Sequence, residues 1–343
     1  LHPWTCGATC CRRIDTEYKS HLAILCTYAV PTIQWVANYL TNRKQLVIID
    51  GIGSGYLDVT SGVPQGSVLG PLLFILYIND IVNEITTGVQ IRLFADDAVL
   101  FRDVSCCADQ CELNTNLTNI LEWCKNWGMV LNADKTLYLR ITRKKVPYDY
   151  QYTLGTSPLK QVTSHKYLGV TLTSNHSWNL HIDNICSSAF RKLCFLKHKL
   201  RNSPSNVKLL SYFTFIRPKL EYACIVWDPY TNHNIRKIER IQRKAVRFIY
   251  SKYSRTDSPS QIMLANKIPS LESRRKCFRL DFLSSLSKGA LSIDPSPFLS
   301  PLQTRPTRHH NPNAFAPYFA ATDTFKYSFF PRTIQEWNEL PPV

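Results

Sequence analysis

Two adjacent aspartates, Asp96 and Asp97, stand between two short apolar segments, Leu93–Ala95 and Ala98–Phe101. Short apolar runs that flank turn residues are typical of strands, so Ile91–Phe101 is predicted to form two strands around the aspartate pair. A hairpin selected only for stability would carry Asn-Gly at its tip, because that pair adopts the tight turn without strain. Adjacent carboxylates repel each other unless a cation lies nearby.

Magnesium would remove this repulsion, because Mg²⁺ binds a few carboxylates together with substrate phosphates. The alternative is that both side chains are simply solvated, which is the commoner situation for two aspartates at a turn. The pair alone does not decide between these hypotheses, so the neighbouring segments are needed.

Two of these segments contain residue types that suit a phosphate ligand. The loop 61–71 holds three of the 12 glycines of the chain, and small residues let a sugar or phosphate approach the backbone closely. It is not a P-loop, because no Gly-Lys-Ser/Thr follows. Downstream, Leu131–Thr136 places Lys135 on a predicted turn, where it is either a solvated cation or a proton donor beside a polyphosphate.

Other local patterns predict short strands. Gln45–Asp50 and Tyr56–Thr60 are read as two strands, and Gly51–Gly55 between them as the turn of a hairpin. These glycines do not match a dinucleotide-binding loop, which has a different spacing and leads into a helix. His165–Leu172 is predicted to be one strand that bends at Gly169.

Apolar residues spaced three and four apart predict helices. Pro71 is expected to open a helix over 72–85, because a proline at a helix start loses no hydrogen bond. Asp109–Trp127 is predicted to be an amphipathic helix that ends at Gly128, and Met129–Ile141 a strand, a turn and a strand. The side chains expected to point inward from the first helix are Leu72, Leu73, Leu76, Ile78 and Ile81.

After residue 176 the patterns become helical and basic, with helices predicted over Leu180–Leu200, Ser205–Ile216 and Asn234–Tyr250. The 343-residue chain has a formal charge of +16, and residues 181–250 hold 14 Lys and Arg against 4 Asp and Glu. This charge indicates an anionic partner, nucleic acid before an anionic membrane. The structural alternative is a solvated helix face that contacts no partner.

Membrane insertion and secretion are not expected. The most apolar run, Val68–Ile78, is shorter than the roughly 20 residues of a membrane-spanning helix. The first residues, Leu1–Trp4, lack the features of a signal peptide. The 12 cysteines show no Cys-x-x-Cys spacing of a zinc site. We therefore expect free thiols in an intracellular protein, nuclear or cytoplasmic.

Five motifs, in this order, resemble those of reverse transcriptases from non-LTR retrotransposons. They are Ser61-Gly-Val-Pro-Gln-Gly-Ser-Val-Leu-Gly-Pro71, Tyr77-Ile-Asn-Asp80, Phe94-Ala-Asp-Asp97, Leu131-Asn-Ala-Asp-Lys-Thr136 and Tyr167-Leu-Gly-Val170. Later segments are similar to the C-terminal region of the same elements, namely Leu220-Glu-Tyr-Ala223, Trp227, 238–247 and Trp337-Asn-Glu-Leu-Pro341. The resemblance covers roughly residues 31–343.

The resemblance implies roles for these motifs. Asp96 is implied to be the metal-binding catalytic aspartate of the palm hairpin and Asp97 its less central companion, with Mg²⁺ as cofactor and Mn²⁺ as the alternative. Lys135 is implied to protonate the departing pyrophosphate. The other implied contacts are the template and nucleotide for Pro64, Gln65, Gly66 and Phe94, and the nucleic-acid backbone for Arg240, Arg243 and Arg247. Tyr167, Leu168 and Gly169 are implied to belong to a hairpin that grips the primer.

The implied fold is α+β, a polymerase palm with an antiparallel sheet and packed helices, followed by a helical thumb, with the fingers missing. The expected divisions are a remnant of the fingers and first palm motif over 1–30, the palm over 31–176, the basic thumb over 177–290, and a Pro-rich arm and tail over 291–343. The implied reaction transfers a nucleotide from a dNTP to a primer 3′-hydroxyl. The implied partners are an RNA template (the element RNA) and a DNA primer, and no membrane.

One motif of this family is missing from the sequence. The first palm strand of the family carries an aspartate, in a motif like Asp-Phe-Ser-Lys-Ala-Phe-Asp that should lie near residues 4–14. Trp4–Ile14 contains no aspartate, and the surroundings of Asp15 do not match the motif. We therefore expect an N-terminally truncated polymerase that is inactive as it stands. The alternatives are a non-catalytic, basic nucleic-acid-binding remnant and a pseudogene product.

Overall fold

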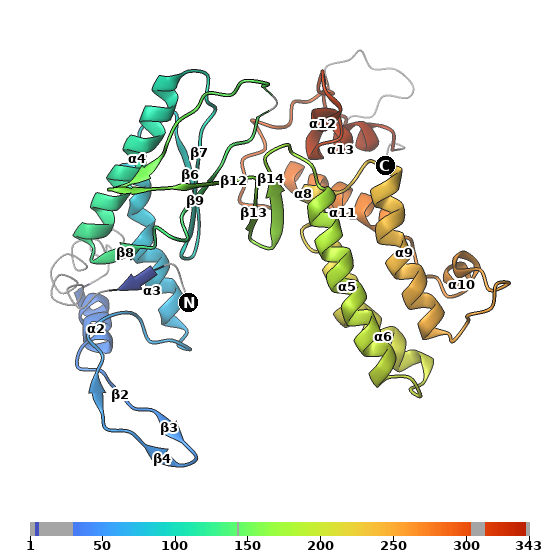
Figure 1. Cartoon of the computed structure of the whole chain (residues 1–343), viewed down its shortest axis with the longest axis horizontal. Coiled ribbons are helices and arrows are strands. Elements are labelled where there is room, and N and C mark those ends of the chain that lie inside the picture. The colour runs from blue at the N-terminus through green and yellow to red at the C-terminus, as the bar shows by residue number, and fades with distance from the viewer. Residues whose placement is uncertain (1–3, 7–29, 143, 303–312, 341–343) are drawn as a thin grey trace. The chain divides into compact units, whose positions relative to one another are not determined.

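The computed structural model describes residues 4–6, 30–142, 144–302 and 313–340 (Figure 1). It divides into two compact units between Val162 and Thr163, upstream of the boundary expected at residue 176. The division lies there because the hairpin that follows Thr163 packs on a helix of the second unit.

The mixed α+β class is confirmed for the described ranges. Strands in these ranges pair two by two, in seven small sheets, and not in one broad antiparallel sheet. The expected assignment of a palm and a thumb therefore does not follow from the sheet pattern, and it stays a prediction. None of the helices found in the described ranges is long and apolar enough to cross a membrane.

The predicted first hairpin is present, but its turn differs. β2 (Lys44–Gln45) pairs with β5 (Leu57–Asp58), and β3 (Ile48–Ile49) pairs with β4 (Ile52–Gly53). The tight turn is formed by Asp50 and Gly51, whose φ angles of +51° and +82° are those of a type I′ turn. Residues 51–55 were predicted to be the turn; that was wrong, because Ile52–Gly53 belongs to a strand.

The helix predicted over 72–85 begins earlier and changes type. α2 (Val30–Leu40) precedes it, α3 spans Leu69–Ile78, and a 3₁₀ helix, η1, continues over Asn79–Glu84. Leu73, Ile78 and Ile81 are buried as predicted. Leu72 is 53% exposed, so its predicted inward position was wrong. Consecutive helical residues point about 100° apart, and Leu73 occupies the side that packs against Val36.

α4 (Cys107–Asn126) forms the main support of the first unit, close to its predicted bounds. Its buried Ile120, Trp123 and Cys124 share a core with β6 (Gln90–Phe94), β7 (Asp97–Phe101) and β8 (Met129–Leu131). The hydroxyl of Tyr77, in α3, donates a hydrogen bond to the carbonyl oxygen of Trp127 and joins α3 to the end of α4. In Figure 1 the β6–β7 hairpin lies beside α4.

The strand, turn and strand predicted over 129–141 are confirmed as β8 and β9 (Leu137–Leu139), but these strands do not pair with each other. β8 pairs with β1 (Trp4–Cys6), and β9 runs parallel to β12 (Lys160–Val162). A small hairpin of β10 (Thr153–Leu154) and β11 (Ser157–Pro158) completes the unit.

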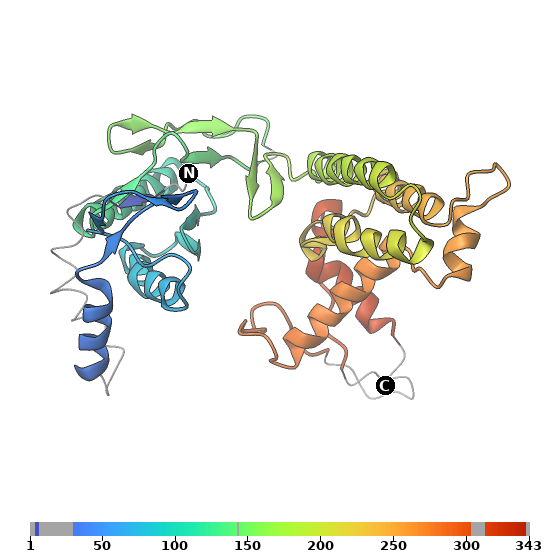
Figure 2. The same ribbon diagram turned by 90° about the horizontal axis from the view of Figure 1, so that it is seen from below.

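The second unit begins with a hairpin and is otherwise helical (Figures 1 and 2). The helices predicted over Leu180–Leu200, Ser205–Ile216 and Asn234–Tyr250 are confirmed with small shifts. The elements are β13 (Ser164–Tyr167), β14 (Val170–Thr173), α5 (Asn179–Lys199), α6 (Ser205–Phe215), α7 (Arg217–Glu221), α8 (Cys224–Trp227), α9 (Asn232–Ile249), α10 (Pro259–Ala265), α11 (Leu271–Ser287), α12 (Asp323–Lys326) and α13 (Phe329–Asn338).

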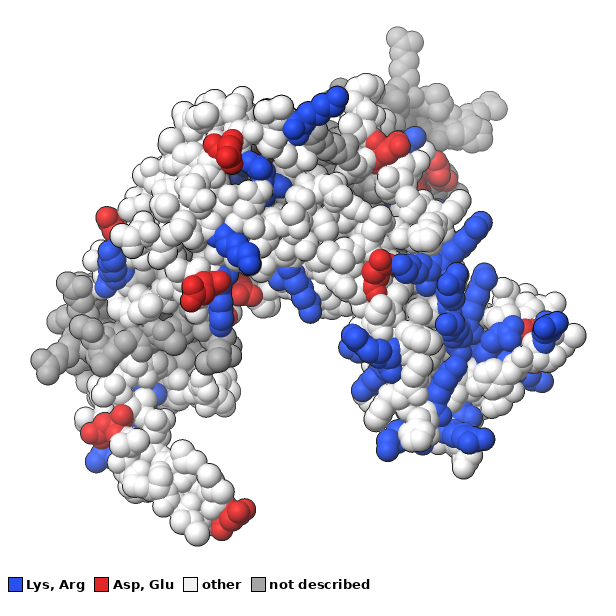
Figure 3. All heavy atoms as spheres, in the orientation of Figure 1, with Lys and Arg blue, Asp and Glu red and all other residues white. Residues whose placement is uncertain are grey.

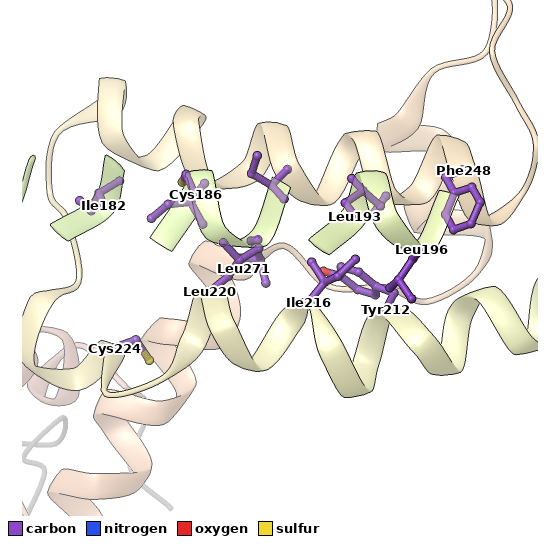
Figure 4. Close-up of a cluster of buried hydrophobic side chains, with 14 of the residues drawn as sticks. Ile182, Cys186, Leu193, Leu196, Tyr212, Ile216, Leu220, Cys224, Phe248 and Leu271 are labelled. Atoms are coloured by element: carbon purple, nitrogen blue, oxygen red, sulfur yellow. The ribbon is translucent and has the colours of Figure 1, made fainter. Parts of the chain in front are cut away.

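The core of this unit lies between α5, α6 and α9. Ile182 and Leu193 of α5, Tyr212 of α6 and Leu271 of α11 are almost completely buried in one continuous cluster (Figure 4). Apolar residues at helical spacing on each helix face this cluster, as their sequence pattern predicts. Burial of such side chains stabilises a unit by roughly 1.5–3 kcal/mol for each residue.

Asp228, in the segment after α8, is the centre of a buried group of charges. Its carboxylate accepts hydrogen bonds from Arg275, 2.5 Å away at Nε, and from Arg279. Arg332 lies 3.3 Å from the same carboxylate, and Glu336 accepts hydrogen bonds of 2.8 and 2.6 Å from Arg279. The network therefore joins α11 and α13 to the segment between α8 and α9.

Candidate active site

The β6–β7 hairpin carries the two aspartates at its tip, as predicted. Its antiparallel register sets Phe94 opposite Asp97, so Ala95 and Asp96 form the two-residue turn. Ala95 has a φ of +52°, in the left-handed region that disfavours residues with a side chain. Asp96 is half-buried and Asp97 is exposed.

The base of this hairpin rests on the core of the first unit. Ile91 is buried, and Leu93 and Leu100 pack against the cluster that contains Trp123. Because successive strand residues point to opposite faces, the same register leaves Phe94 exposed next to the aspartates. The aspartate turn is thus held on a packed support.

The loop 61–71 folds back on the first turn of α3. The hydroxyl of Ser67 donates a hydrogen bond to the carbonyl oxygen of Pro64 at 2.7 Å, and it accepts one from the backbone N–H of Gly70 at 2.9 Å. A Cβ at Gly70 would lie 2.7 Å from the carbonyl oxygen of Pro64, so this approach requires glycine. Gln65 and Gly66 are left exposed in the loop.

Lys135 lies on the turn between β8 and β9, as predicted. The side-chain oxygen of Asn132 accepts a hydrogen bond from the backbone N–H of Lys135 at 3.1 Å. The carbonyl oxygen of Asn132 also accepts a hydrogen bond from Thr136 N–H at 3.1 Å. An asparagine that bonds the backbone a few residues on stabilises a turn. Its effect here is to present the Lys135 side chain at the surface.

The structure brings Asp96 and Asp97 together at one hairpin tip, Asp96 in the turn and Asp97 at the start of β7. Gln65 and Lys135 lie on two other turns of the same unit, and their approach to the aspartates stays a prediction. Among the residues that the structure describes, no three or more His, Cys, Asp or Glu side chains form a group that could hold a metal ion. Asp96 and Asp97 are therefore candidate metal ligands as a pair.

Tyr167, Leu168 and Gly169 lie at a tight turn in the second unit, so the strand pattern's prediction of one bent strand was wrong, whereas the hairpin implied by the resemblance is confirmed. β13 and β14 pair antiparallel, with Tyr167 opposite Val170. Leu168 and Gly169 form the turn, with φ angles of +44° and +85°. Two positive φ angles reverse the chain direction, where the sequence pattern suggested only a bend.

His181, near the start of α5, is a buried histidine that the sequence reasoning missed. Its Nδ1 accepts a hydrogen bond from the backbone N–H of Thr171, in β14, at 3.1 Å. The ring therefore carries its proton on Nε2, which has no hydrogen-bond partner in the described part of the chain. Burial is the main reason, and the charge of Lys166 the second, that the pKa of His181 is lowered to about 4.

We predict that His181 makes the second unit sensitive to acid. The unfolded chain protonates this histidine near its ordinary pKa of 6.5, and the folded chain only near 4. Stability is therefore complete above pH 6.5 and is lost as the pH falls toward 4, by about 2–3 kcal/mol at pH 4.5. Urea unfolding at pH 7 and pH 4.5 measures this loss.

The variant His181→Asn serves as the test, because an amide oxygen can replace Nδ1 as acceptor but cannot titrate. It should lose most of the acid sensitivity. His165→Asn, at an exposed position of β13, is the matched control and should keep it. Equal pH dependence in all three proteins would contradict the assignment.

Helix α9 presents a row of cations at helical spacing. Arg236, Arg240 and Arg243 are exposed, and spacings of four and three place them on one side of the helix. Figure 3 shows Lys and Arg side chains gathered over the helices of the second unit. Arg247 differs, because its guanidinium donates a hydrogen bond to the carbonyl oxygen of Asp257 at 3.1 Å. Arg247 thus holds the loop after α9.

Two polar residues of the 238–247 motif serve the fold, which the sequence analysis missed. The carboxylate of Glu239 accepts a hydrogen bond from Glu272 N–H at 2.9 Å, at the start of α11. Gln242 is buried and donates to the carbonyl oxygen of Pro269 at 2.9 Å. Each follows a buried isoleucine, Ile238 or Ile241, and this adjacency to the apolar face was the available signal.

Residues 17–172 match the family model of reverse transcriptase, described as RNA-dependent DNA polymerase. The chain is 29% identical over 236 residues to a probable RNA-directed DNA polymerase from transposon X-element of Drosophila melanogaster, covering 66% of this chain and 26% of that protein. It is also 29% identical to the RNA-directed DNA polymerase from mobile element jockey of Drosophila melanogaster, over 62% of this chain and 24% of that protein.

A third relative is the Retrovirus-related Pol polyprotein from type-1 retrotransposable element R1 2 of Nasonia vitripennis, which is 24% identical over 48% of this chain and 43% of the relative. The chain thus spans about a quarter of the length of the X-element and jockey polymerases.

The hairpin that carries two carboxylates at its tip lies inside the segment that matches the reverse transcriptase family model. As its motifs predicted, the chain is similar to RNA-directed DNA polymerases of non-LTR retrotransposons.

Proposed function

We propose that this chain is the palm and thumb part of a non-LTR retrotransposon polymerase, which copies the element RNA into DNA from a DNA primer and dNTPs. The observation that carries the proposal is the β6–β7 hairpin, which has a half-buried and an exposed aspartate at its tip and a packed base. By this proposal the first unit contains the palm, and the second unit contains the thumb.

The aspartate turn suits a divalent ion, which polymerases of this family use. Two adjacent carboxylates at a partly exposed turn are hard oxygen ligands, and Mg²⁺ prefers one or two of these together with substrate phosphates. Asp96 and Asp97 would hold the ion, with Mn²⁺ as the alternative. When bound, the ion would supply charge stabilisation at the transferring phosphoryl group.

The other motif residues would bind and orient the substrates. The exposed Gln65 and Gly66 leave backbone accessible for the template and the incoming nucleotide, and the exposed Phe94 lies beside the aspartates. Lys135, presented by its asparagine turn, would donate a proton to the departing pyrophosphate. Tyr167 and the Leu168–Gly169 turn would contact the primer.

The second unit would bind the duplex through phosphates. Arg236, Arg240 and Arg243 form an exposed row, and cations that contact phosphates bind nucleic acid without much sequence preference. We expect Arg240→Ala/Arg243→Ala to weaken binding to an RNA·DNA duplex at low salt. The slope of log K against log[salt] should also fall by about 2, because each lost phosphate contact contributes about one.

Lys276→Ala/Lys288→Ala is the control, since it removes two exposed cations at α11. It should leave both affinity and salt slope close to those of the unmodified chain. Arg247→Ala is not combined with these substitutions, because Arg247 also stabilises the loop after α9. Unchanged affinity and slope in the Arg240/Arg243 variant would favour a solvated helix face over a phosphate-binding one.

A second function, non-catalytic nucleic-acid binding, is favoured by the absence of aspartate from residues 4–14. One experiment distinguishes the two functions. A chimaera that regains the first aspartate motif should extend a primer if the chain is part of a polymerase. A pure binding protein would gain no activity from the graft.

A further inference from the structure

The Leu168–Gly169 turn has a backbone that needs support. Leu168 adopts a φ of +44°, a left-handed conformation that is unfavourable for a residue with a branched side chain. A two-stranded hairpin is also marginally stable in water unless it packs against another element. The contacts that hold this turn therefore decide how well the proposed primer contact is ordered.

Tyr222, in the segment between α7 and α8, contacts this turn in two ways. Its hydroxyl donates a hydrogen bond to the carbonyl oxygen of Leu168 at 3.1 Å. Its ring lies so close to Gly169 that a Cβ there would be 2.9 Å from Cε1. Tyr222 is nevertheless 59% exposed, so its burial in a core does not explain its position.

The backbone of Tyr222 is itself fixed by the helical unit. Its N–H donates to the carbonyl oxygen of Pro218 at 2.9 Å, and its carbonyl oxygen accepts a hydrogen bond from Trp227 Nε1 at 2.9 Å. The fully buried Trp227 lies 5.0 Å, between ring centroids, from His181. His181 binds Thr171 of β14.

The hairpin is therefore anchored at two points. Tyr222 holds its turn, and His181 holds its second strand. Trp227 contacts both residues, so the two anchors belong to one continuous set of contacts. The neighbours of Tyr222 serve the helices instead: Leu220 is buried in the core and Glu221 pairs with Arg274.

We propose that Tyr222 is a positioning residue that fixes the Leu168–Gly169 turn to the helical unit, so that the hairpin and the basic helices grip the primer-template duplex as one body. This inference rests on the proposed function of the hairpin and of the basic helices. It gives the Leu220-Glu-Tyr-Ala223 motif a function that its sequence alone does not indicate.

The first test follows the hairpin without any nucleic acid. Tyr222→Phe removes the hydroxyl and keeps the ring against Gly169. Hydrogen exchange of the peptide that covers 164–173 should become about 3- to 10-fold faster, the factor that one net hydrogen bond provides. Tyr230→Phe is the control, because the hydroxyl of Tyr230 has no hydrogen bond within the described residues. Unchanged exchange in Tyr222→Phe would overturn the anchor.

The second test measures binding to an RNA·DNA duplex. Tyr222→Phe should lower the affinity about 3- to 10-fold, by the same single hydrogen bond. The loss should become smaller when the exposed hairpin cation is already removed, in Lys166→Ala, because Tyr222 then has fewer hairpin contacts to position. Purely additive losses would mean that Tyr222 acts independently of the hairpin, and would overturn the positioning role.

The exchange test and the binding test together distinguish a failure of this inference from a failure of the proposed function. If the unmodified chain fails to bind the duplex, the proposed function is contradicted and the positioning role with it, while the exchange result still decides whether the anchor exists. If the duplex binds, and exchange and affinity both respond only in the Tyr222 variant, both proposals are supported.

Discussion

Replacing Asp228 by Asn is expected to destabilise the second unit by about 3–5 kcal/mol, the usual cost of breaking a buried ion pair from one side. Arg275 and Arg279 are almost completely buried, and both bond to the Asp228 carboxylate. Burial lowers the pKa of each guanidinium, because burial disfavours the charged form. Without the carboxylate, Arg275 and Arg279 would lose the charged acceptor that they share, and Arg279 would keep its hydrogen bonds to Glu336.

Urea unfolding of the second unit, followed by circular dichroism, measures the loss. The matched control is Asp183→Asn, which also removes an aspartate that pairs with a cation, Lys237, but at a much more exposed site. Exposed pairs contribute about 0–1 kcal/mol. Similar losses in the two variants would show that the Asp228 network does not hold α11 and α13 in place.

Local features of this fold could be predicted from the sequence because they depend on neighbouring residues. The β6–β7 hairpin follows from two apolar runs around Asp96 and Asp97, and the amphipathic helices follow from apolar residues at spacings of three and four. The turn at Leu168 could not be predicted in this way. Leucine has no preference for a positive φ, and the apolar run beyond Gly169 reads as a continued strand.

Contacts between residues far apart in the chain could not be predicted from the local sequence pattern. Asp228 is 47 residues from Arg275 and 104 residues from Arg332 in the chain. An arginine in a sequence is expected to be solvated, and only the packing of α11 and α13 buries Arg275 and Arg279. The same holds for Tyr222, whose partner Leu168 is 54 residues away.

The unmodified chain is expected to show no measurable primer extension on poly(A) with oligo(dT), dTTP and Mg²⁺. Two-metal catalysis needs a rigid carboxylate set that holds the ions about 3.5–4 Å apart. The family resemblance places the first palm-strand aspartate near residues 4–14, which contain none, so under the proposed function Asp96 and Asp97 would act without that carboxylate. Loss of one member of a catalytic set commonly costs several powers of ten in rate.

Replacing residues 1–14 by an intact fingers and first-palm-strand segment should restore extension, and Asp96→Asn in that chimaera should abolish it again. Asp103→Asn, an exposed aspartate just beyond the end of β7, is the control and should leave the restored activity unchanged. Equal losses of primer extension in the Asp96→Asn and Asp103→Asn chimaeras would show that the activity does not depend specifically on the hairpin tip. Robust extension by the unmodified chain would mean that another carboxylate, with Asp15 the first candidate, already completes the set, because two aspartates on one turn provide only part of it.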